Sequence, residues 1–428
     1  RPMTTILGLV LAVLVAANVP LAFALLVTSC IVMVLMGNSL DMIPQMFVGG
    51  IQSFVLLAVP LFMLAGGLMN EAGVTDRLFR FTRALVGHIA GGLAHVNVIS
   101  NLIMAGMSGS AVADATGLGA VQIPAMQKQG YTAKFAAAIT AASATIGPIF
   151  PPSIPMVIFG GMANVSVGKL FLGGAVPALF MAAFLMVTIS ILARRRGLPR
   201  DQKATWGEFG QSFRESATAL VLPIIIMGGI IGGIFTPTEA AGVAAVYALI
   251  LGLFIYRTLT LRMLPRIFAE TATSTAVVML IIAATSPLRW VIAAEKIPDA
   301  IFQVLSTVTS SPMVLLLILN IVFLILGCVM ETTAIIVLST PILIPLIKAF
   351  HIDPVHFGVV FVLNLMIGLL TPPVGMCMFV VCAIAKISVE DFVKESIPFF
   401  IALLAVLGLI TYIPALVTWL PTMVFSYF

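Results

Sequence analysis

The sequence predicts an all-α protein that crosses a membrane many times and consists of two related halves. Of its 428 residues, 61% are hydrophobic and only 9% are charged, whereas a soluble globular protein carries about 25% charged residues. Apolar stretches recur from Thr4 to the C-terminus, and a helix that spans a bilayer needs roughly 20 such residues. Prolines and glycines also recur at one constant spacing in the two halves. Lipid is therefore the expected main solvent.

The N-terminal region, residues 1–90, is predicted to form scaffold helices and one amphipathic arm. Its apolar run from Ile6 to Met36 contains no small-residue cleavage site before polar sequence, so we expect membrane domain rather than a signal peptide. Residues 75–89 instead mix apolar positions with three regularly spaced arginines, Arg77, Arg80 and Arg83. Such a helix lies along the bilayer surface.

An internal repeat is the strongest signal in the sequence. One offset of 221 residues aligns Pro124 with Pro345, Thr132 with Asp353, Gly147 with Gly368, Pro151-Pro152 with Pro372-Pro373, and Pro177 with Pro398. Each half thus contains an apolar segment, a small-polar interruption, a second apolar segment, a turn and a helix broken at Gly-x-x-x-Pro-Pro. We assign residues 91–193 to a first transport repeat and residues 312–428 to a second repeat with a C-terminal span.

The interruptions at residues 106–114 and 327–333 are predicted to be the tips of re-entrant helical hairpins. Unwound backbone at membrane depth is tolerated only where it is buried in protein or lines a polar cavity. The double prolines break a helix near residues 147–153 and again near 368–375, because proline removes a backbone donor and clashes with the preceding turn. Paired breaks in corresponding positions of two halves indicate a transport site near the bilayer midplane.

Residues 194–311 are predicted to contain a basic loop, arm helices and scaffold spans. The loop concentrates positive charge at Arg194, Arg195, Arg196, Arg200 and Lys203. The positive-inside rule places it in the cytoplasm. Because the loop follows a span directly and lacks interleaved aromatic residues, we exclude nucleic-acid binding. Residues 206–220 and 259–270 are amphipathic and are predicted to be further arms.

Hydroxyl-bearing residues cluster at both breaks and indicate sites for a hard cation. Broken helices offer free carbonyls, and these together with hydroxyl oxygens suit sodium. The polar residues concerned are Ser108, Ser110, Ser143 and Thr145 at the first break and Thr332, Thr333, Asn364 and Thr371 at the second. Proton coupling normally uses carboxylate or histidine relays, of which this core has few, so sodium is favoured. Alternatively, each hydroxyl bonds back to a helix carbonyl.

Four ionisable residues lie in apolar sequence, where each costs about 2.5–3.5 kcal/mol on insertion scales. Asp114 and Glu331 either cap the second helix of their hairpins or face the substrate. Glu239 fits a capping box and is otherwise a gating candidate. Arg289 either grips a substrate carboxylate or reaches towards the interface. The complete set of substrate-cavity candidates is Asp114, Pro152, Ser153, Glu331 and Pro373.

Two other classes of function explain less of the sequence. Gly106-Met107-Ser108-Gly109 fits the short Gly-x-Ser-Gly form of rhomboid-like serine proteases, with His95 as the base, but a protease leaves the second half unexplained. A channel would need rings of pore-lining charge, whereas two halves that meet at broken helices favour alternating access. The cysteines are expected to be small buried hydrophobes; they are Cys30, Cys328, Cys377 and Cys382.

Over essentially its whole length the sequence resembles the large membrane subunit of tripartite ATP-independent periplasmic (TRAP) transporters. The matching stretches are residues 91–97, 107–114, 147–153, 235–239 and 368–375. The resemblance implies a sodium-coupled, elevator-type importer in the bacterial inner membrane. Its substrate would be an organic anion such as a C4-dicarboxylate, sialic acid or another sugar acid. Implied partners are a small four-helix membrane subunit, expected as a separate chain, and a periplasmic binding protein.

The resemblance also implies two sodium sites, with Na+ as the only bound cofactor. The first would be formed by Ser108, Ser110 and Gly147. The second would be formed by Thr332, Thr333, Gly368 and Thr371. The resemblance carries no role onto Arg289.

Overall fold

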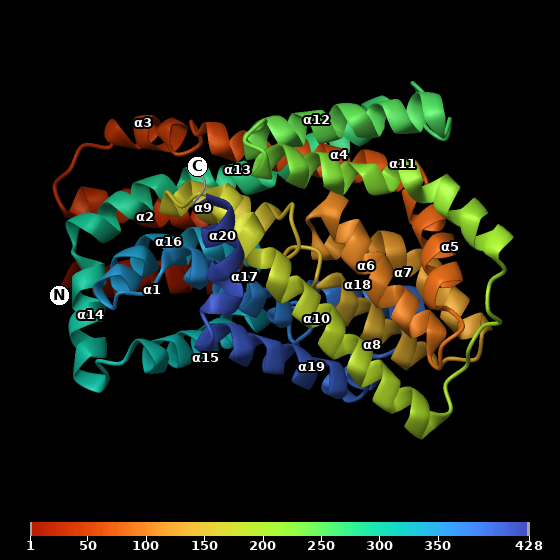
Figure 1. The fold of residues 1–428 in the computed structure, drawn as a ribbon. Coiled ribbons are helices and arrows are strands. Elements are labelled where there is room, and N and C mark those ends of the chain that lie inside the picture. The colour runs from red at the N-terminus through yellow and green to blue at the C-terminus, as the bar shows by residue number, and fades with distance from the viewer. Residues whose placement is uncertain (1, 426–428) are drawn as a thin grey trace.

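The computed structural model describes residues 2–425, which form helices joined by turns and loops and contain no β-strand (Figure 1). The predicted units 1–90 and 312–428 also include Arg1 and residues 426–428, which lie outside the described part of the chain. The division into four units stays a prediction. The N-terminal region contains α1 (Pro2–Ala16), α2 (Leu21–Leu35), α3 (Met42–Gly49), η1 (Phe54–Leu57), α4 (Ala58–Glu71) and α5 (Val74–Val86).

The first repeat is a hairpin followed by a broken helix. Its elements are α6 (Gly92–Ser108), α7 (Ala111–Lys128), α8 (Ala133–Ala144), α9 (Ile154–Ala163) and α10 (Val167–Arg196). The hairpin turns at Gly109, whose φ of +60° favours glycine, and a Cβ there would lie 2.7 Å from the carbonyl oxygen of Pro152. Ser110 then caps α7, and Ser153 caps α9 after the break.

The second repeat follows the same order, which confirms the predicted duplication. Its elements are α15 (Pro312–Val329), α16 (Thr332–Ala349), α17 (Pro354–Gly368), α18 (Met376–Ala385), α19 (Val389–Tyr412) and α20 (Ala415–Phe425). The offset of 221 residues carries the bounds of α7 onto the bounds of α16 without remainder. Thr132 caps α8, and Asp353 caps α17, as the paired sequence positions predict.

The middle region differs in part from the prediction. It contains α11 (Trp206–Ile231), α12 (Pro237–Ile250), the π-helical turn η2 (Leu251–Ile255), α13 (Leu264–Ala294) and α14 (Ile297–Val308). Residues 206–220 are not a separate arm but the first part of α11, and most of the third predicted arm is the first part of α13. In both cases the amphipathic stretch continues into an apolar one within a single helix.

The sequence analysis missed α14, which is the second short amphipathic helix. The repeat offset carries α5 (Val74–Val86) onto residues 295–307, which almost coincide with α14. Figure 1 shows α5 and α14 at opposite ends of the molecule. Each repeat therefore begins with an arm, and the two arms lie on opposite sides.

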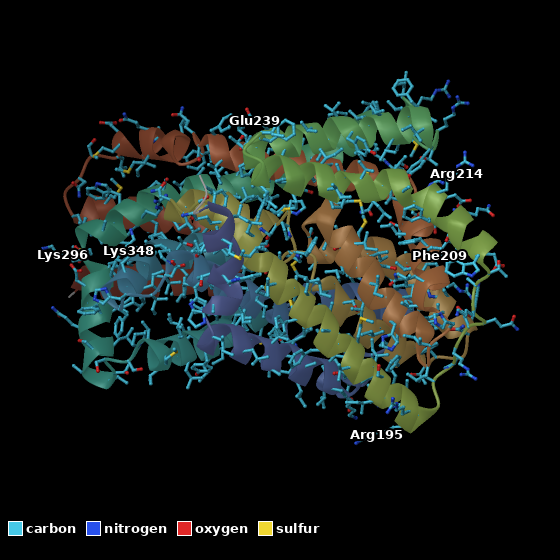
Figure 2. All side chains as sticks on the ribbon, in the orientation of Figure 1. Arg195, Phe209, Arg214, Glu239, Lys296 and Lys348 are labelled. Carbon is cyan, nitrogen blue, oxygen red and sulfur yellow. The ribbon has the colours of Figure 1, made fainter. Side chains whose placement is uncertain are left out.

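Basic side chains distinguish the two ends. Figure 2 shows Arg195 and Arg214 at the end that contains α5, and Lys296 and Lys348 at the end that contains α14. All residues of the basic loop belong to the first end, which the positive-inside rule assigns to the cytoplasm. Eight helices of the described chain are long and apolar enough to span a bilayer, so the protein is an integral membrane protein.

A polar cluster ties the basic loop to the base of the first hairpin. Arg83 of α5 donates two hydrogen bonds to Asp201, of 2.7 and 3.0 Å, and these raise the pKa of Arg83. Gln129, after α7, also donates to the Asp201 carboxylate, and the Tyr131 hydroxyl donates to the carbonyl oxygen of Pro199 at 3.0 Å. We call these contacts the Asp201 cluster.

The two repeats pack against each other through aromatic rings near the breaks. Phe159 of α9 lies 6.2 Å from Phe357 and 6.1 Å from Phe361 of α17, measured between ring centroids. A Cβ on Gly358 would lie 2.4 Å from the Phe159 ring, so α9 and α17 approach closely there. This contact brings the broken helices of both halves to one place.

Candidate functional site

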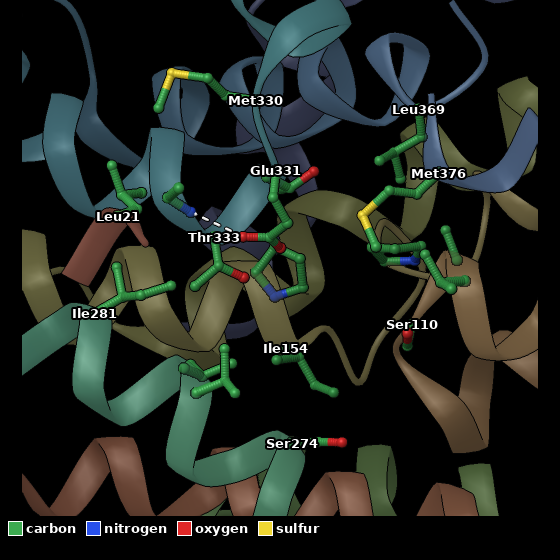
Figure 3. Close-up of a pocket in the computed structure, with 18 of the residues that line it drawn as sticks. Leu21, Ser110, Ile154, Ser274, Ile281, Met330, Glu331, Thr333, Leu369 and Met376 are labelled. Atoms are coloured by element: carbon green, nitrogen blue, oxygen red, sulfur yellow. Dashed lines mark hydrogen bonds between the residues drawn. The ribbon is translucent and has the colours of Figure 1, made fainter. Parts of the chain in front are cut away.

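Both hairpin tips and both helix breaks line one cavity of about 950 Å³. The tips contribute Gly109, Ser110, Glu331 and Thr332, and the breaks contribute Pro148 and Leu369. Helix α13 and the turn between α1 and α2 close the remaining sides. Figure 3 shows Ser110 and Leu21 on opposite sides of this cavity.

The lining is mostly apolar and contains no cationic group. Its polar side chains belong to Asn18, Ser110, Ser274, Glu331, Thr332 and Thr333. Among the described residues that line the cavity there is no lysine, arginine or histidine. Helices α7, α9, α16 and α18 all begin at cavity-lining residues, and the free N–H groups of a helix start favour negative charge. An anion here would therefore meet neutral donors.

Behind the first tip lies a buried carboxylate. Asp114 is only 1% exposed, and no described residue gives either carboxylate oxygen a hydrogen bond of ordinary geometry; the Ser108 hydroxyl lies beside it. A Cβ on Gly147 would lie 2.5 Å from Asp114 Oδ2, so the carboxylate touches the break of the first repeat. An uncompensated buried charge costs several kcal/mol. The position therefore requires a cation or a proton.

Asp114 does not line the cavity, which corrects its assignment as a substrate contact. It also does not cap α7, because Ser110 does so by accepting a hydrogen bond from Ala113 N at 3.4 Å. Of the residues predicted for the first sodium site, Ser108 and Gly147 adjoin Asp114, whereas Ser110 faces the cavity.

The second break is closed by contacts to its own hairpin tip. The Thr371 hydroxyl lies 2.9 Å from Cys328 Sγ and donates to the carbonyl oxygen of Gly368 at 2.8 Å. Val374 N donates to the carbonyl oxygen of Cys328 at 2.9 Å. Thr332 and Thr333 line the cavity instead. Cys328 is thus a partly buried polar contact, which corrects its prediction as a buried hydrophobe, because its thiol faces a hydroxyl rather than a hydrocarbon side chain.

The two tips carry their charges differently. The offset of 221 residues pairs Ser110 with Glu331, and each caps the helix that follows; Glu331 Oε2 accepts from Ala334 N at 3.1 Å (Figure 3). The same offset pairs Asp114 with Ile335, which is buried and apolar. The first repeat therefore holds its carboxylate behind the tip, whereas the second repeat presents one to the cavity.

The other predicted cavity residues do not line this cavity. Ser153 is fully buried, where it caps α9 and donates to the carbonyl oxygen of Pro148. Pro152 is buried next to Gly109, and Pro373 is exposed but points elsewhere. The chain turns within each break, so neighbouring residues face the cavity in their place.

The two remaining ionisable candidates also lie outside the cavity. Glu239 completes the predicted capping box: its carboxylate accepts from Thr236 N at 2.7 Å, and its own N–H donates to the Thr236 hydroxyl at 3.3 Å. Figure 2 shows Glu239 at the outer edge of the molecule. Arg289 is partly buried near the end of α13 and forms no ion pair with a described residue.

A serine-protease site is not assembled. Ser108 and His95 lie thirteen residues apart on the same helix, a separation of about 20 Å at 1.5 Å per residue. His95 Nε2 instead lies 3.4 Å from the Ser190 hydroxyl. The described residues also contain no group of three histidine, cysteine or acidic side chains that could hold a metal ion.

Two polar lining residues were missed by the sequence analysis, Asn18 and Ser274. Ser274 stands alone in the apolar face of α13, and no sequence pattern marks it. Asn18 had a signal, because it comes two residues before Pro20 inside a long apolar run. An asparagine and a proline at that spacing are typical of a turn.

Comparisons with known proteins place the chain in a family. The model of the family "Tripartite ATP-independent periplasmic transporter, DctM component" matches residues 9–416. The chain is 43% identical over 415 residues to the sialic acid TRAP transporter large permease protein SiaM of Vibrio cholerae, covering 97% of both chains. It is 40% identical to the 2,3-diketo-L-gulonate TRAP transporter large permease protein YiaN of Escherichia coli, covering 94% of this chain and 95% of that one.

Two further comparisons agree. The C4-dicarboxylate TRAP transporter large permease protein DctM of Pseudomonas aeruginosa is 40% identical over 370 residues, which cover 86% of this chain and 87% of that one. The crystal structure of the YdaH transporter of Alcanivorax borkumensis superposes with a TM-score of 0.63 at 14% identity, covering 85% of this chain and 86% of that one, and so shares the fold. The chain therefore belongs to the DctM family of tripartite ATP-independent periplasmic transporters.

Proposed function

We propose that the protein is the transport subunit of a sodium-coupled carrier that imports an organic anion. The observation that carries this proposal is the convergence of both hairpin tips and both helix breaks on one cavity. Its volume of about 950 Å³ falls in the range of small-molecule sites, roughly 300–1,000 Å³. The relatives are named for sialic acid, 2,3-diketo-L-gulonate and C4-dicarboxylates. All three are carboxylates, so a carboxylate is the proposed substrate class.

Neutral donors would hold the substrate carboxylate. Ser110, Thr332 and Thr333 offer hydroxyl groups at the starts of α7 and α16. Hydrogen bonds to an ionised group are stronger than those between neutral groups. A cavity without fixed positive charge releases an anion more easily than one that pairs it with arginine, which suits a carrier.

Sodium would neutralise the buried charge of the first repeat. Asp114, Ser108 and the carbonyl end of α8 at Gly147 supply oxygen ligands of the kind that a hard cation prefers. At the second site, proposed to use Thr371, Gly368 and the tip threonines, no buried carboxylate balances the ion. Its positive charge remains available to the substrate, so sodium and anion would favour each other's binding.

Transport would follow from movement of the two repeats against the scaffold helices, as in an elevator. The arms α5 and α14 lie at the start of each repeat, where they can brace the hairpins. In the bacterial inner membrane the proposed partners are a small four-helix subunit and a periplasmic binding protein that delivers the anion.

Uptake into proteoliposomes tests this proposal. The chain would be reconstituted with its small subunit and binding protein, and uptake of labelled sialic acid, 2,3-diketo-L-gulonate and succinate would be measured with and without an inward sodium gradient. Saturable uptake that requires sodium and the binding protein is expected. Uptake driven by a pH gradient alone would assign a proton to Asp114, and uptake that never saturates would favour a channel.

A further inference from the structure

The turn between α1 and α2 lies inside the membrane and reaches the cavity. Helix α2 (Leu21–Leu35) has 15 residues and is therefore about 22 Å long, less than the roughly 30 Å of hydrocarbon in a bilayer. It ends in a polar loop where the Ser39 hydroxyl donates to Asp41. Since that loop belongs at the membrane surface, Pro20 at the other end of α2 lies at membrane depth.

The turn belongs to the scaffold and not to either hairpin. Ala22 and Leu25 of α2 pack in one apolar cluster with Ala284 and Leu288 of α13. Val15, Asn18, Val19, Pro20 and Leu21 nevertheless line the same cavity as the hairpin tips. A third turn thus faces the space between the two mobile tips, and Figure 3 shows its residue Leu21 across the cavity from Ser110.

Asn18 is the polar residue of this turn. Its side chain is exposed, and polar groups at membrane depth persist only where they face protein or a polar cavity. Among the described lining residues it carries the only side-chain N–H group; the other polar side chains there are hydroxyls and the Glu331 carboxylate. Because the cavity has no cation, this amide is a donor that an anion can use.

We propose that Asn18 is a substrate-binding residue whose side-chain amide donates to a carboxylate oxygen of the transported anion. The inference rests on the proposed function, since it takes the cavity as the substrate site. A substrate bound in this way bridges the scaffold and the hairpin tips. The bridge must break when the repeats move, so Asn18 contributes to binding in this state and not to the state on the other side.

The backbone of Asn18 offers a simpler explanation that must be tested. Its φ is +61°, and it ends α1 with the paired bonds Val19 N to Leu14 O, 3.0 Å, and Asn18 N to Val15 O, 2.9 Å. Glycine or asparagine is usual at this capping position. Asn18→Gly therefore keeps the cap and removes only the amide. Asn164 is the matched control, because it ends α9 with φ +53° and does not line the cavity.

The experiment compares wild type, Asn18→Gly, Asn18→Asp and Asn164→Gly in the complete reconstituted complex. The probes are labelled sialic acid, 2,3-diketo-L-gulonate and succinate, and uptake is measured against probe concentration and against sodium. Asn18→Gly is expected to raise KM for the transported probe roughly tenfold or more, as the loss of a hydrogen bond to a charged group does, with unchanged half-saturating sodium. Asn18→Asp is expected to raise KM further, and Asn164→Gly is expected to match wild type.

Each other result overturns the inference. A wild-type KM in Asn18→Gly would make Asn18 a helix cap only. An equal rise in Asn164→Gly would assign the effect to the capping backbone. If wild type transports none of the three probes, the proposed function itself fails, and this outcome is distinct from active wild type with an indifferent Asn18→Gly.

Discussion

At the residue scale, the surroundings of Asp114 explain why a carboxylate is placed where no water reaches it. The residue touches Gly147 and Ser108 and lacks a cationic neighbour to pair with. The sequence marked Asp114 as unusual but not which way it faces. Helix α7 is buried on several sides, so its hydrophobic periodicity does not reveal which face meets the cavity.

Replacing Asp114 with asparagine removes the charge and keeps the shape. We expect Asp114→Asn to raise the half-saturating sodium concentration for uptake at least roughly tenfold, because the ion loses its charged ligand. The measurement is uptake against external sodium, with Glu239→Gln as a control acid outside the cavity. A sodium curve that coincides with wild type would remove Asp114 from the ion site.

Two hydroxyl groups are expected to act on sodium in the same direction. Ser108→Ala and Thr371→Ala should each weaken the sodium dependence of uptake, because each removes an oxygen beside a break. Thr116→Ala is the control, since the Thr116 hydroxyl is exposed and bonds back to the carbonyl oxygen of Val112 at 2.7 Å. Wild-type sodium dependence in either test variant would contradict that site.

The closest backbone approach at the second break requires glycine. A Cβ on Gly368 would lie 2.7 Å from the backbone of Gly327, which cannot move as a flexible side chain can. We expect Gly368→Ala to lower the free energy of unfolding by about 1–3 kcal/mol, measured as thermal unfolding in detergent. Gly408→Ala, where no atom lies within 4 Å of the new Cβ, should unfold like wild type. Equal stability of the two variants would argue against the tight approach.

At the element scale, the helices that the sequence predicted best are those with a strong local signal at both ends. The hairpins and breaks have glycine, proline and capping residues in both repeats, and the structure confirms them. Residues 206–220 carry an amphipathic pattern but no helix end, so nothing local separated them from the rest of α11. Helix α14 escaped because its polar residues are few, although the repeat offset from α5 could have located it.

The Asp201 cluster should hold the loop between α10 and α11 against the first hairpin. Asp201→Asn is expected to increase hydrogen exchange of residues 197–205 severalfold, with a loss of about 1 kcal/mol or less in global stability because Arg83 is half exposed. Lys394→Gln, at an exposed pair with Glu390, is the matched control. Unchanged exchange in the loop would mean that Asp201 does not restrain it.

At the scale of the whole molecule, the duplication predicted two opposite arms and one shared cavity only in outline. The sequence indicated that the breaks meet, because paired interruptions share a function. It did not indicate that α1 and α2 also reach that place. Their turn has no counterpart among the repeat signals, and its neighbours in the cavity are more than 90 residues away in the chain.

The distribution of charge fixes the orientation in the membrane. In a chain whose four native cysteines are replaced, Arg195→Cys should react with an impermeant thiol reagent only from the cytoplasm, and Lys296→Cys only from the periplasm. The measurement is labelling of intact cells against inverted vesicles. Labelling of both positions from the same side would contradict the arrangement in Figure 2.

Short tethers also limit the mechanics of the carrier. Five residues, 87–91, join α5 to α6, and three residues, 309–311, join α14 to α15. Extended chain reaches at most about 3.6 Å per residue, so the second tether cannot exceed about 11 Å. Any longer stroke of the repeats must come from rotation of the arms about their ends, as levers about 20 Å long. Arm length thus sets the distance that cargo can be carried in one cycle.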